Sequence, residues 1–215
     1  KVSFIWSVAD LLRGDYKASE YGRVMLPLVV LRRLDCVLEP TKAAVLERAK
    51  SLTIQNVEPV LCRVAGQSFY NTSPLTFRKL LDDPGQVAGN LTSYINGFSS
   101  TARETFEKFD FGDQISRLDE AGILYQVVQK FSTIDLHPDA VSNVEMGYIF
   151  EELIRRFSEQ SNETAGEHFT PREVVRLMVD LLFLEDDALL RDRSVNRTLY
   201  DPACGTGGML SVAEE

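Results

Sequence analysis

Few residues of this chain are suited to metal binding or covalent cross-linking. Its 215 residues include three cysteines, Cys36, Cys62 and Cys204, and two histidines, His137 and His168. The cysteines are odd in number and irregularly spaced, so they fit neither a disulfide framework nor a zinc pattern, and they indicate a reducing compartment. The histidines stand far apart, with no second type of ligand at metal-binding spacing. We therefore expect no metal site and a cytoplasmic protein.

Long apolar runs and an excess of positive charge are also missing. The longest apolar run, 24–31, is far shorter than the roughly 20 residues that a membrane helix needs. Lys1 leads directly into an amphipathic stretch without the features of a signal peptide. Acidic residues outnumber basic ones by 32 to 23, which gives a net charge of −9. The short apolar run excludes a membrane protein. The charge balance argues against a chain that grips DNA mainly through a basic face.

What the sequence does contain is helical periodicity over its first 160 residues. Apolar side chains recur there at three- and four-residue steps, and strand signals are scarce before residue 195. Helices are expected at 3–12, 21–38, 41–51, 76–81, 87–98, 113–120, 123–131 and 144–158. Pro27 should kink the second of these helices or mark a restart. The fold class is therefore mainly α, with a helical N-terminal domain at 1–160.

The character of the sequence changes after a polar stretch at 158–166 that lacks periodicity. The elements expected beyond it are an amphipathic helix at 171–184, a charged connection at 186–197, a short strand at 198–200, a glycine-rich turn and a helix at 208–215. A strand followed by a turn and a helix is typical of an α/β fold. Residues 161–215 therefore differ in type from the helical part before them.

The glycine-rich turn is the most informative segment for chemistry. It reads Asp-Pro-Ala-Cys-Gly-Thr-Gly-Gly-Met from Asp201 and contains Gly205, Gly207 and Gly208. Glycines in such a turn let the backbone approach a ligand, and the helix N-terminus behind them suits a carboxylate or phosphate. The turn is not a Walker loop, because no Lys-Ser or Lys-Thr follows the glycines. It is not a dinucleotide Gly-x-Gly-x-x-Gly motif either, because the third glycine position is Leu210. A plain strand-to-helix turn is the simpler alternative.

A second segment, Gly-Glu-His-Phe-Thr-Pro-Arg-Glu at 166–173, has the signature of a capped helix start. Thr170 is expected as the N-cap, Pro171 at the first helical position, and Glu173 as the partner in a capping box. Taken alone, this would be only a well-started helix. Gly166 and Phe169 before the cap are typical of a loop that folds over a flat ligand.

Together the two segments resemble the modification subunit of type I restriction–modification systems, a family of N6-adenine DNA methyltransferases. The glycine-rich turn is similar to the first motif of class I S-adenosylmethionine-dependent methyltransferases. The helical part resembles the same family at 24–35, 90–99 and 146–154, so the resemblance covers nearly the whole chain. It implies a helical domain at 1–160 and, at 161–215, the truncated beginning of a class I α/β methyltransferase domain.

The resemblance implies a site for S-adenosylmethionine that is built from both segments. One wall would consist of Glu167, His168, Phe169, Thr170, Pro171 and Arg172, and the other of Asp201, Gly205, Thr206, Gly207 and Gly208. The implied reaction is methyl transfer from this cofactor to adenine N6 in DNA. No catalytic residue is assigned, because the family's Asn/Asp-Pro-Pro-Phe/Tyr motif is absent from the sequence. We therefore expect an N-terminal fragment of the subunit that is inactive alone.

The resemblance also implies partners: DNA, a specificity subunit, a restriction subunit and a second modification subunit. The net negative charge agrees with this division, because sequence-independent affinity for DNA requires clustered Lys and Arg. If the helical domain contacts DNA, Arg32 and Arg33 are the first candidates. A solvated helix face is the alternative interpretation of this pair.

Two other functions stay open from the residues themselves. One is a class I methyltransferase that acts on a protein or a small molecule, which would share the glycine-rich turn but not the Thr-Pro-Arg segment with this helical domain. The other is a non-catalytic helical assembly module in which the glycine-rich turn is incidental. An Asn-Pro-Pro-Phe motif in the following residues of the gene would decide the first, and titration with S-adenosylmethionine would decide the second.

Overall fold

Helices dominate the computed structural model of the chain, which describes residues 1–52, 56–160, 170–184, 198–204 and 207–213. Within these residues the only β-type pairings are two isolated bridges, Arg13 with Tyr16 and Asn71 with Phe98. The mainly α fold class is therefore confirmed. The chain divides into two compact units, which we call unit 1 (Lys1–Ser142) and unit 2 (Asn143–Glu215).

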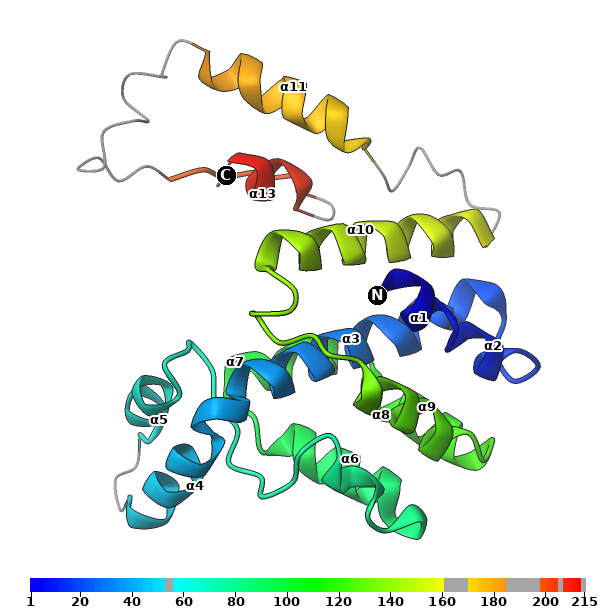
Figure 1. Cartoon of the computed structure of the whole chain (residues 1–215), viewed down its shortest axis with the longest axis vertical. Coiled ribbons are helices and arrows are strands. Elements are labelled where there is room, and N and C mark those ends of the chain that lie inside the picture. The colour runs from blue at the N-terminus through cyan, green and yellow to red at the C-terminus, as the bar shows by residue number, and fades with distance from the viewer. Residues whose placement is uncertain (53–55, 161–169, 185–197, 205–206, 214–215) are drawn as a thin grey trace. The chain divides into compact units, whose positions relative to one another are not determined.

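Unit 1 contains helices α1 to α9 together with short 3₁₀ turns (Figure 1). Its α-helices are α1 (Val2–Trp6), α2 (Ala9–Leu12), α3 (Tyr21–Leu38), α4 (Lys42–Ser51), α5 (Glu58–Ala65), α6 (Val87–Asn96), α7 (Ser100–Lys108), α8 (Phe111–Glu120) and α9 (Leu124–Thr133). The 3₁₀ turns are η1 (Ala18–Glu20), η2 (Glu39–Thr41), η3 (Lys79–Leu81) and η4 (Pro84–Gln86).

Helix α3 lies at the centre of unit 1, and α2, α8 and α9 all pack against it. Its predicted bounds are confirmed, and side chains such as Val24, Leu28 and Leu31 are fully buried. Pro27 lies inside one uninterrupted helix, so the predicted restart is wrong. Proline removes the amide that would bond to the carbonyl of Arg23. Arg23 is exposed, so water can satisfy that carbonyl instead.

The two arginines of α3 that were DNA-contact candidates are buried inside unit 1. Arg32 and Arg33 are only 7% and 8% exposed. Nε of Arg32 donates a hydrogen bond to the carbonyl of Ile134 at 2.9 Å, and Nη1 of Arg33 donates to the carbonyls of Leu136 and Val141. Burial lowers the pKa of Arg33 from its usual value. Both guanidiniums thus serve as internal donors, and their position argues against the predicted DNA contact.

The helix predicted at 3–12 is interrupted at Ser7, which contacts a lysine that is distant in the sequence. Nζ of Lys130 on α9 lies 3.3 Å from the carbonyl oxygen of Ser7 and 3.1 Å from its Oγ. Oγ of Ser7 also donates to the carbonyl of Phe4 at 2.7 Å. A serine that bonds to nearby backbone competes with the helix ladder. α1 therefore ends at Trp6, and α2 begins at Ala9.

Two helices were missed by sequence reasoning, and one expected helix is shorter. α5 carries helix signals in Pro59 near its start and in Gly66, which caps its end in the left-handed conformation at φ 65°. α7 buries a single side chain, Phe106, and therefore shows little apolar periodicity. The helix expected at 76–81 is reduced to the 3₁₀ turn η3.

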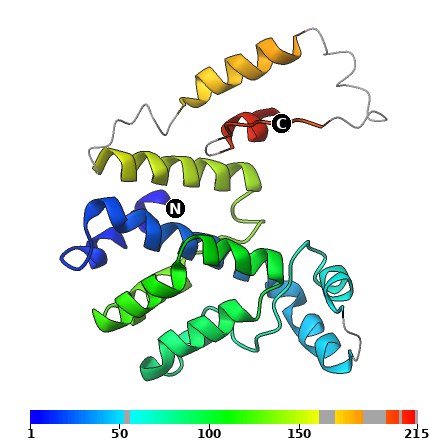
Figure 2. The ribbon, with the colours of Figure 1, turned by 180° about the vertical axis from the view of Figure 1, so that it is seen from behind.

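The helices among the described residues of unit 2 are α10 (Asn143–Gln160), α11 (Arg172–Phe183) and α13 (Gly208–Ala213). α13 packs against both α10 and α11, and α11 lies beside α13 in both views (Figure 1 and Figure 2). The small core of unit 2 contains Val175, Val179 and Val212, and Phe183, Met209 and Ala213 are partly buried around them. The strand expected at 198–200 is not formed, since no neighbouring strand among the described residues pairs with it.

The division at Asn143 groups α10 with α11 and α13, whereas the sequence-based boundary lies at residue 160. The expected linker at 158–166 and the charged connection at 186–197 lie largely outside the described residues. Within the described parts of the chain, every helix falls short of the length and apolar character that a bilayer crossing demands.

We predict that Arg33→Met destabilises unit 1 by about 2–4 kcal/mol, because the buried carbonyls of Leu136 and Val141 lose their donor. Urea denaturation followed by circular dichroism would measure the change. The matched control is Arg23→Met, an exposed arginine on the same helix, which should stay within about 0.5 kcal/mol of the wild type. Equal effects of the two substitutions would contradict the assigned role of Arg33.

Candidate functional site

The glycine-rich turn is closed by two backbone hydrogen bonds of Gly207, whose backbone conformation favours glycine. Gly207 has φ +79°, a conformation that other residues adopt only at a cost. Its amide donates to the carbonyl of Cys204 at 2.7 Å, and its carbonyl accepts from the amide of Ser211 at 2.9 Å. The chain therefore turns sharply into α13 at Gly207. Gly205 and Thr206 lie outside the described residues.

Asp201 stands at the start of this turn and supports it. Its Oδ1 accepts a hydrogen bond from the backbone amide of Ala203 at 3.0 Å, which is the bond of an Asx-turn. The side chain is half-buried, and its Oδ2 has no partner among the described residues. Asp201 can thus hold the turn with one oxygen and accept a hydrogen bond from a ligand with the other.

Helix α11 starts one residue later than predicted. Pro171 is its N-cap, with φ −54° and ψ 138°, and no side chain caps the helix. The carbonyl of Pro171 accepts from the amides of Val174 and Val175, both at 3.0 Å. The predicted capping box of Thr170 and Glu173 is therefore wrong, because Thr170 lies one position before the cap. Thr170 and Pro171 are exposed, whereas Glu167, His168 and Phe169 lie outside the described residues.

Arg172, the first residue of α11, is held by two side chains of α10. Its Nη1 lies 3.5 Å from Oε2 of Glu151, and its guanidinium carbon lies 3.9 Å from the ring centroid of Tyr148. The side chains of Arg172 and Glu151 are 12% and 18% exposed. We call these three residues the Arg172 clamp. Sequence reasoning missed it, although Tyr148 and Glu151 stand three residues apart and so share a helix face.

The described parts of the two predicted walls lead into helices that pack together, α11 and α13. A Cβ atom built on Gly208 would lie 3.7 Å from Cγ2 of Val175, which is one turn into α11. The segment Thr170–Arg172 and the turn from Asp201 to Gly208 therefore lead into adjoining helices. The first amides of α11 have no partner within the helix, and its dipole makes this end positive. An anionic group of a ligand would be stabilised there.

A second apolar face of α11 faces solvent in the described structure. Its residues are 45–63% exposed and recur at helical spacing; they are Val174, Leu177, Met178, Leu181 and Leu182. The opposite side of the helix carries the buried Val175 and Val179. α11 is thus apolar on two sides, which is typical of a helix between two layers of a larger domain.

No group of three or more His, Cys, Asp or Glu side chains among the described residues is arranged to hold a metal ion.

Comparisons with known proteins agree with this arrangement. Residues 1–131 match the model of the HsdM N-terminal domain, and residues 142–215 match that of N-6 DNA methylase. A type I restriction enzyme MjaIX methylase subunit from Methanocaldococcus jannaschii is 25% identical over 98% of this chain and 38% of its own length. A type I restriction enzyme EcoEI methylase subunit from Escherichia coli is 33% identical over 61% of this chain and 24% of its own length.

The two matches together place the chain in the class of proteins in which an HsdM N-terminal domain precedes an N-6 DNA methylase region. Within that class, the chain belongs to the family of type I restriction enzyme methylase subunits. The chain spans 38% of the length of the MjaIX subunit and 24% of the length of the EcoEI subunit.

We predict that Gly207→Ala destabilises the turn by about 1 kcal/mol, because alanine is strained at φ +79°. The matched substitution Gly208→Ala should be tolerated, because its Cβ would meet Val175 at an ordinary van der Waals distance. Hydrogen exchange of the α13 amides would measure the difference. Equal exchange rates in the two variants would contradict the geometry of the turn.

For the Arg172 clamp, we predict that Tyr148→Leu and Glu151→Gln each speed hydrogen exchange in the first turn of α11 by about fivefold. The matched control is Glu159→Gln, which changes an exposed ion pair of α10 with Arg155 and should have little effect. Unchanged exchange in the Tyr148 and Glu151 variants would show that the clamp does not fix α11.

Proposed function

We propose that this chain supplies the helical domain and the first part of the catalytic domain of a type I modification subunit. In this proposal the subunit transfers a methyl group from S-adenosylmethionine to adenine N6 in DNA. The observation that carries it is the packing of α13 against α11, because the glycine-rich turn leads into α13 and the Thr-Pro-Arg segment leads into α11. The family membership supports the reaction class.

The described residues fit a ligand with the polarity of S-adenosylmethionine. Its carboxylate would meet the positive end of α11 near Thr170, Pro171 and Arg172. Its amino group would donate to Oδ2 of Asp201, whose Oδ1 already holds the turn. The main chain at Gly207 and Gly208 carries no side chain that would block the approach. Glu167, His168, Phe169, Gly205 and Thr206 are proposed to complete the site from the family resemblance.

When bound, S-adenosylmethionine supplies an electrophilic methyl group. The part of this chain in the reaction would be to bind and orient the cofactor. The sequence contains no pair of adjacent prolines and hence no Asn/Asp-Pro-Pro-Phe/Tyr motif for the adenine. We therefore propose that the chain is inactive without the residues that would carry this motif, since the target base must leave the duplex and be held.

The exposed face of α11 supports the same assignment. Five large apolar side chains at helical spacing are costly to leave in water, and a stripe of this size normally marks a packing surface. We propose that the remainder of the methyltransferase domain covers this face. DNA, a specificity subunit, a restriction subunit and a second modification subunit are proposed as partners, and the cytoplasm as the location.

The proposal is tested by calorimetric titration of the full-length subunit with S-adenosylmethionine. We expect saturable binding that Asp201→Asn weakens by about tenfold, because asparagine can still accept from Ala203 but lacks the charge for a ligand ammonium group. The matched control, Asp180→Asn, changes an exposed carboxylate farther along α11 and should bind as the wild type does. Absence of binding by the full-length subunit would favour a non-catalytic assembly module.

A second experiment measures which molecule the assembled complex labels when it transfers labelled methyl groups, and so distinguishes the candidate substrates. Label in adenine N6 of DNA is the expected result. Label in protein or in small molecules, with none in DNA, would overturn the assignment and favour a class I methyltransferase with a different substrate.

A further inference from the structure

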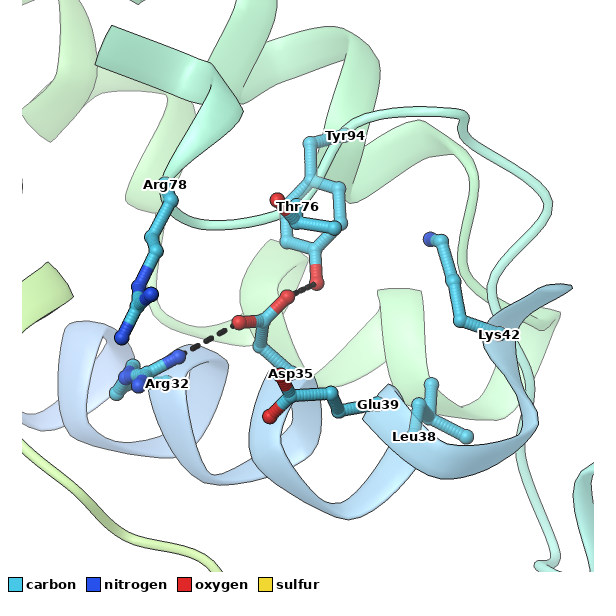
Figure 3. A pocket seen from close by; sticks show the side chains of 8 residues that line it. All are labelled: Arg32, Asp35, Leu38, Glu39, Lys42, Thr76, Arg78 and Tyr94. Atoms are coloured by element: carbon cyan, nitrogen blue, oxygen red, sulfur yellow. Dashed lines mark hydrogen bonds and ion pairs between the residues drawn. The ribbon is translucent and has the colours of Figure 1, made fainter.

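A cavity of about 100 Å³ lies in unit 1, between α3, the start of α4, the segment before η3, and α6. Figure 3 shows the side chains that line it, among them Asp35 and Glu39 from the end of α3 and η2, Lys42 from α4, Arg78 beside η3 and Tyr94 from α6. It is separate from the site in unit 2. Five of its eight lining residues carry an acidic or basic side chain: Arg32, Asp35, Glu39, Lys42 and Arg78.

The charge of Asp35 is fully compensated. Its Oδ1 accepts from the hydroxyl of Tyr94 at 2.6 Å and from the amide of Phe77 at 3.2 Å, and its Oδ2 accepts from Nη1 of Arg32 at 2.7 Å (Figure 3). Burial raises the pKa of Tyr94 well above its usual value, so this hydroxyl keeps its proton and stays a donor. Asp35 and its partners therefore form a rigid, neutral floor for the cavity.

The charge of Lys42 is not compensated. Its Nζ donates to Oδ1 of Asn71 at 3.0 Å and lies 5.2 Å from the ring centroid of Tyr94, and neither group carries a negative charge. Within the described residues no carboxylate forms an ion pair with this ammonium group. Burial lowers the pKa of Lys42 to about 8, and the nearby charge of Asp35 offsets this only in part. A half-buried cation without a counterion is a costly arrangement that a bound anion would relieve.

The lining cations Lys42 and Arg78 outnumber the one lining carboxylate that is left after Asp35 is paired, Glu39. Arg78 is exposed, lies on the opposite side of the Asp35–Tyr94 pair from Lys42 in Figure 3, and forms no ion pair within the described structure. The charge of Lys79 also reaches Lys42 and lowers its pKa further. Glu39 is the one lining carboxylate besides Asp35. This local excess of positive charge stands in a chain whose net charge is −9.

We propose that this cavity binds a phosphate group, which Lys42 holds by its free N–H donors while Arg78 attracts it from the opposite side. Lysine and arginine are the side chains that recognise phosphate through charge-assisted hydrogen bonds. A cavity of about 100 Å³ has room for one such group. The phosphate belongs either to a free small anion or to the backbone of DNA, and the experiments below separate these sources.

The first experiment titrates inorganic phosphate into the full-length protein at constant ionic strength, with calorimetry as the readout. We expect saturable binding that Lys42→Gln weakens by about tenfold and Arg78→Gln by about threefold. The matched control is Lys50→Gln, an exposed lysine on the same helix whose loss should change nothing. Arg78 is a surface residue, so its variant tests the site without endangering the fold.

The second experiment repeats the titration with sulfate, whose charge is constant between about pH 7 and about pH 9. Lys42 is protonated below its pKa of about 8 and neutral above it, so affinity should fall by about tenfold across this range. The other acidic and basic groups around Lys42 are Asp35, Lys79 and Tyr94, and Arg32, Glu39 and Arg78 line the same cavity. Lys42→Gln should therefore abolish the pH dependence.

Absence of phosphate binding, or binding that both Lys42→Gln and Arg78→Gln leave intact, would overturn the proposal. Anisotropy measurements with a short DNA duplex then identify the source. Weaker DNA binding by the two variants, with inorganic phosphate as a competitor, would assign the site to the DNA backbone. Wild-type DNA binding by variants that have lost phosphate would assign it to a free anion. The proposal does not depend on methyl transfer, so its failure leaves the proposed function unchanged.

Discussion

The constraint on which unit 1 depends is the burial of α3 with two guanidinium groups on it. A helix that is packed by neighbours on most sides can carry such groups only if acceptors reach them inside the protein. These acceptors are the carbonyls of Ile134, Leu136 and Val141, which lie more than 100 residues along the chain. The same helix anchors α6 through Asp35 and Tyr94. The apolar core and the closing segment of unit 1 are therefore organised around one element.

Sequence patterns predicted the helices whose apolar periodicity is long, such as α3, and failed where a distant partner decides the outcome. The break at Ser7 depends on Lys130, which no local pattern could reveal. α7 was missed because it buries only Phe106. The arginine pair of α3 looked like a solvated basic cluster, since carbonyl acceptors contributed by remote backbone leave no mark in the sequence. The predicted capping box failed for a local reason, because Pro171 rather than Thr170 takes the cap position.

The conformation of the glycine-rich turn was predictable from the sequence, but the contacts that support it were not. A glycine-rich turn before a helix indicates positive φ, and Gly207 has it. The same pattern says nothing about what holds the turn against α11. That support comes from Val175 beside Gly208, and from Tyr148 and Glu151 of α10 around Arg172. Side chains of α10 and α11 thus set the geometry, and such contacts depend on tertiary packing that periodicity does not encode.

The hydrogen bonds of Arg33 also set the point during synthesis at which unit 1 can complete its folding. Domains generally fold as units while the chain leaves the ribosome. The carbonyl of Val141 is among the last groups of unit 1 to emerge, and the buried charge on α3 stays only partly satisfied until it arrives. The core of unit 1 can therefore close only once its final segment is exposed.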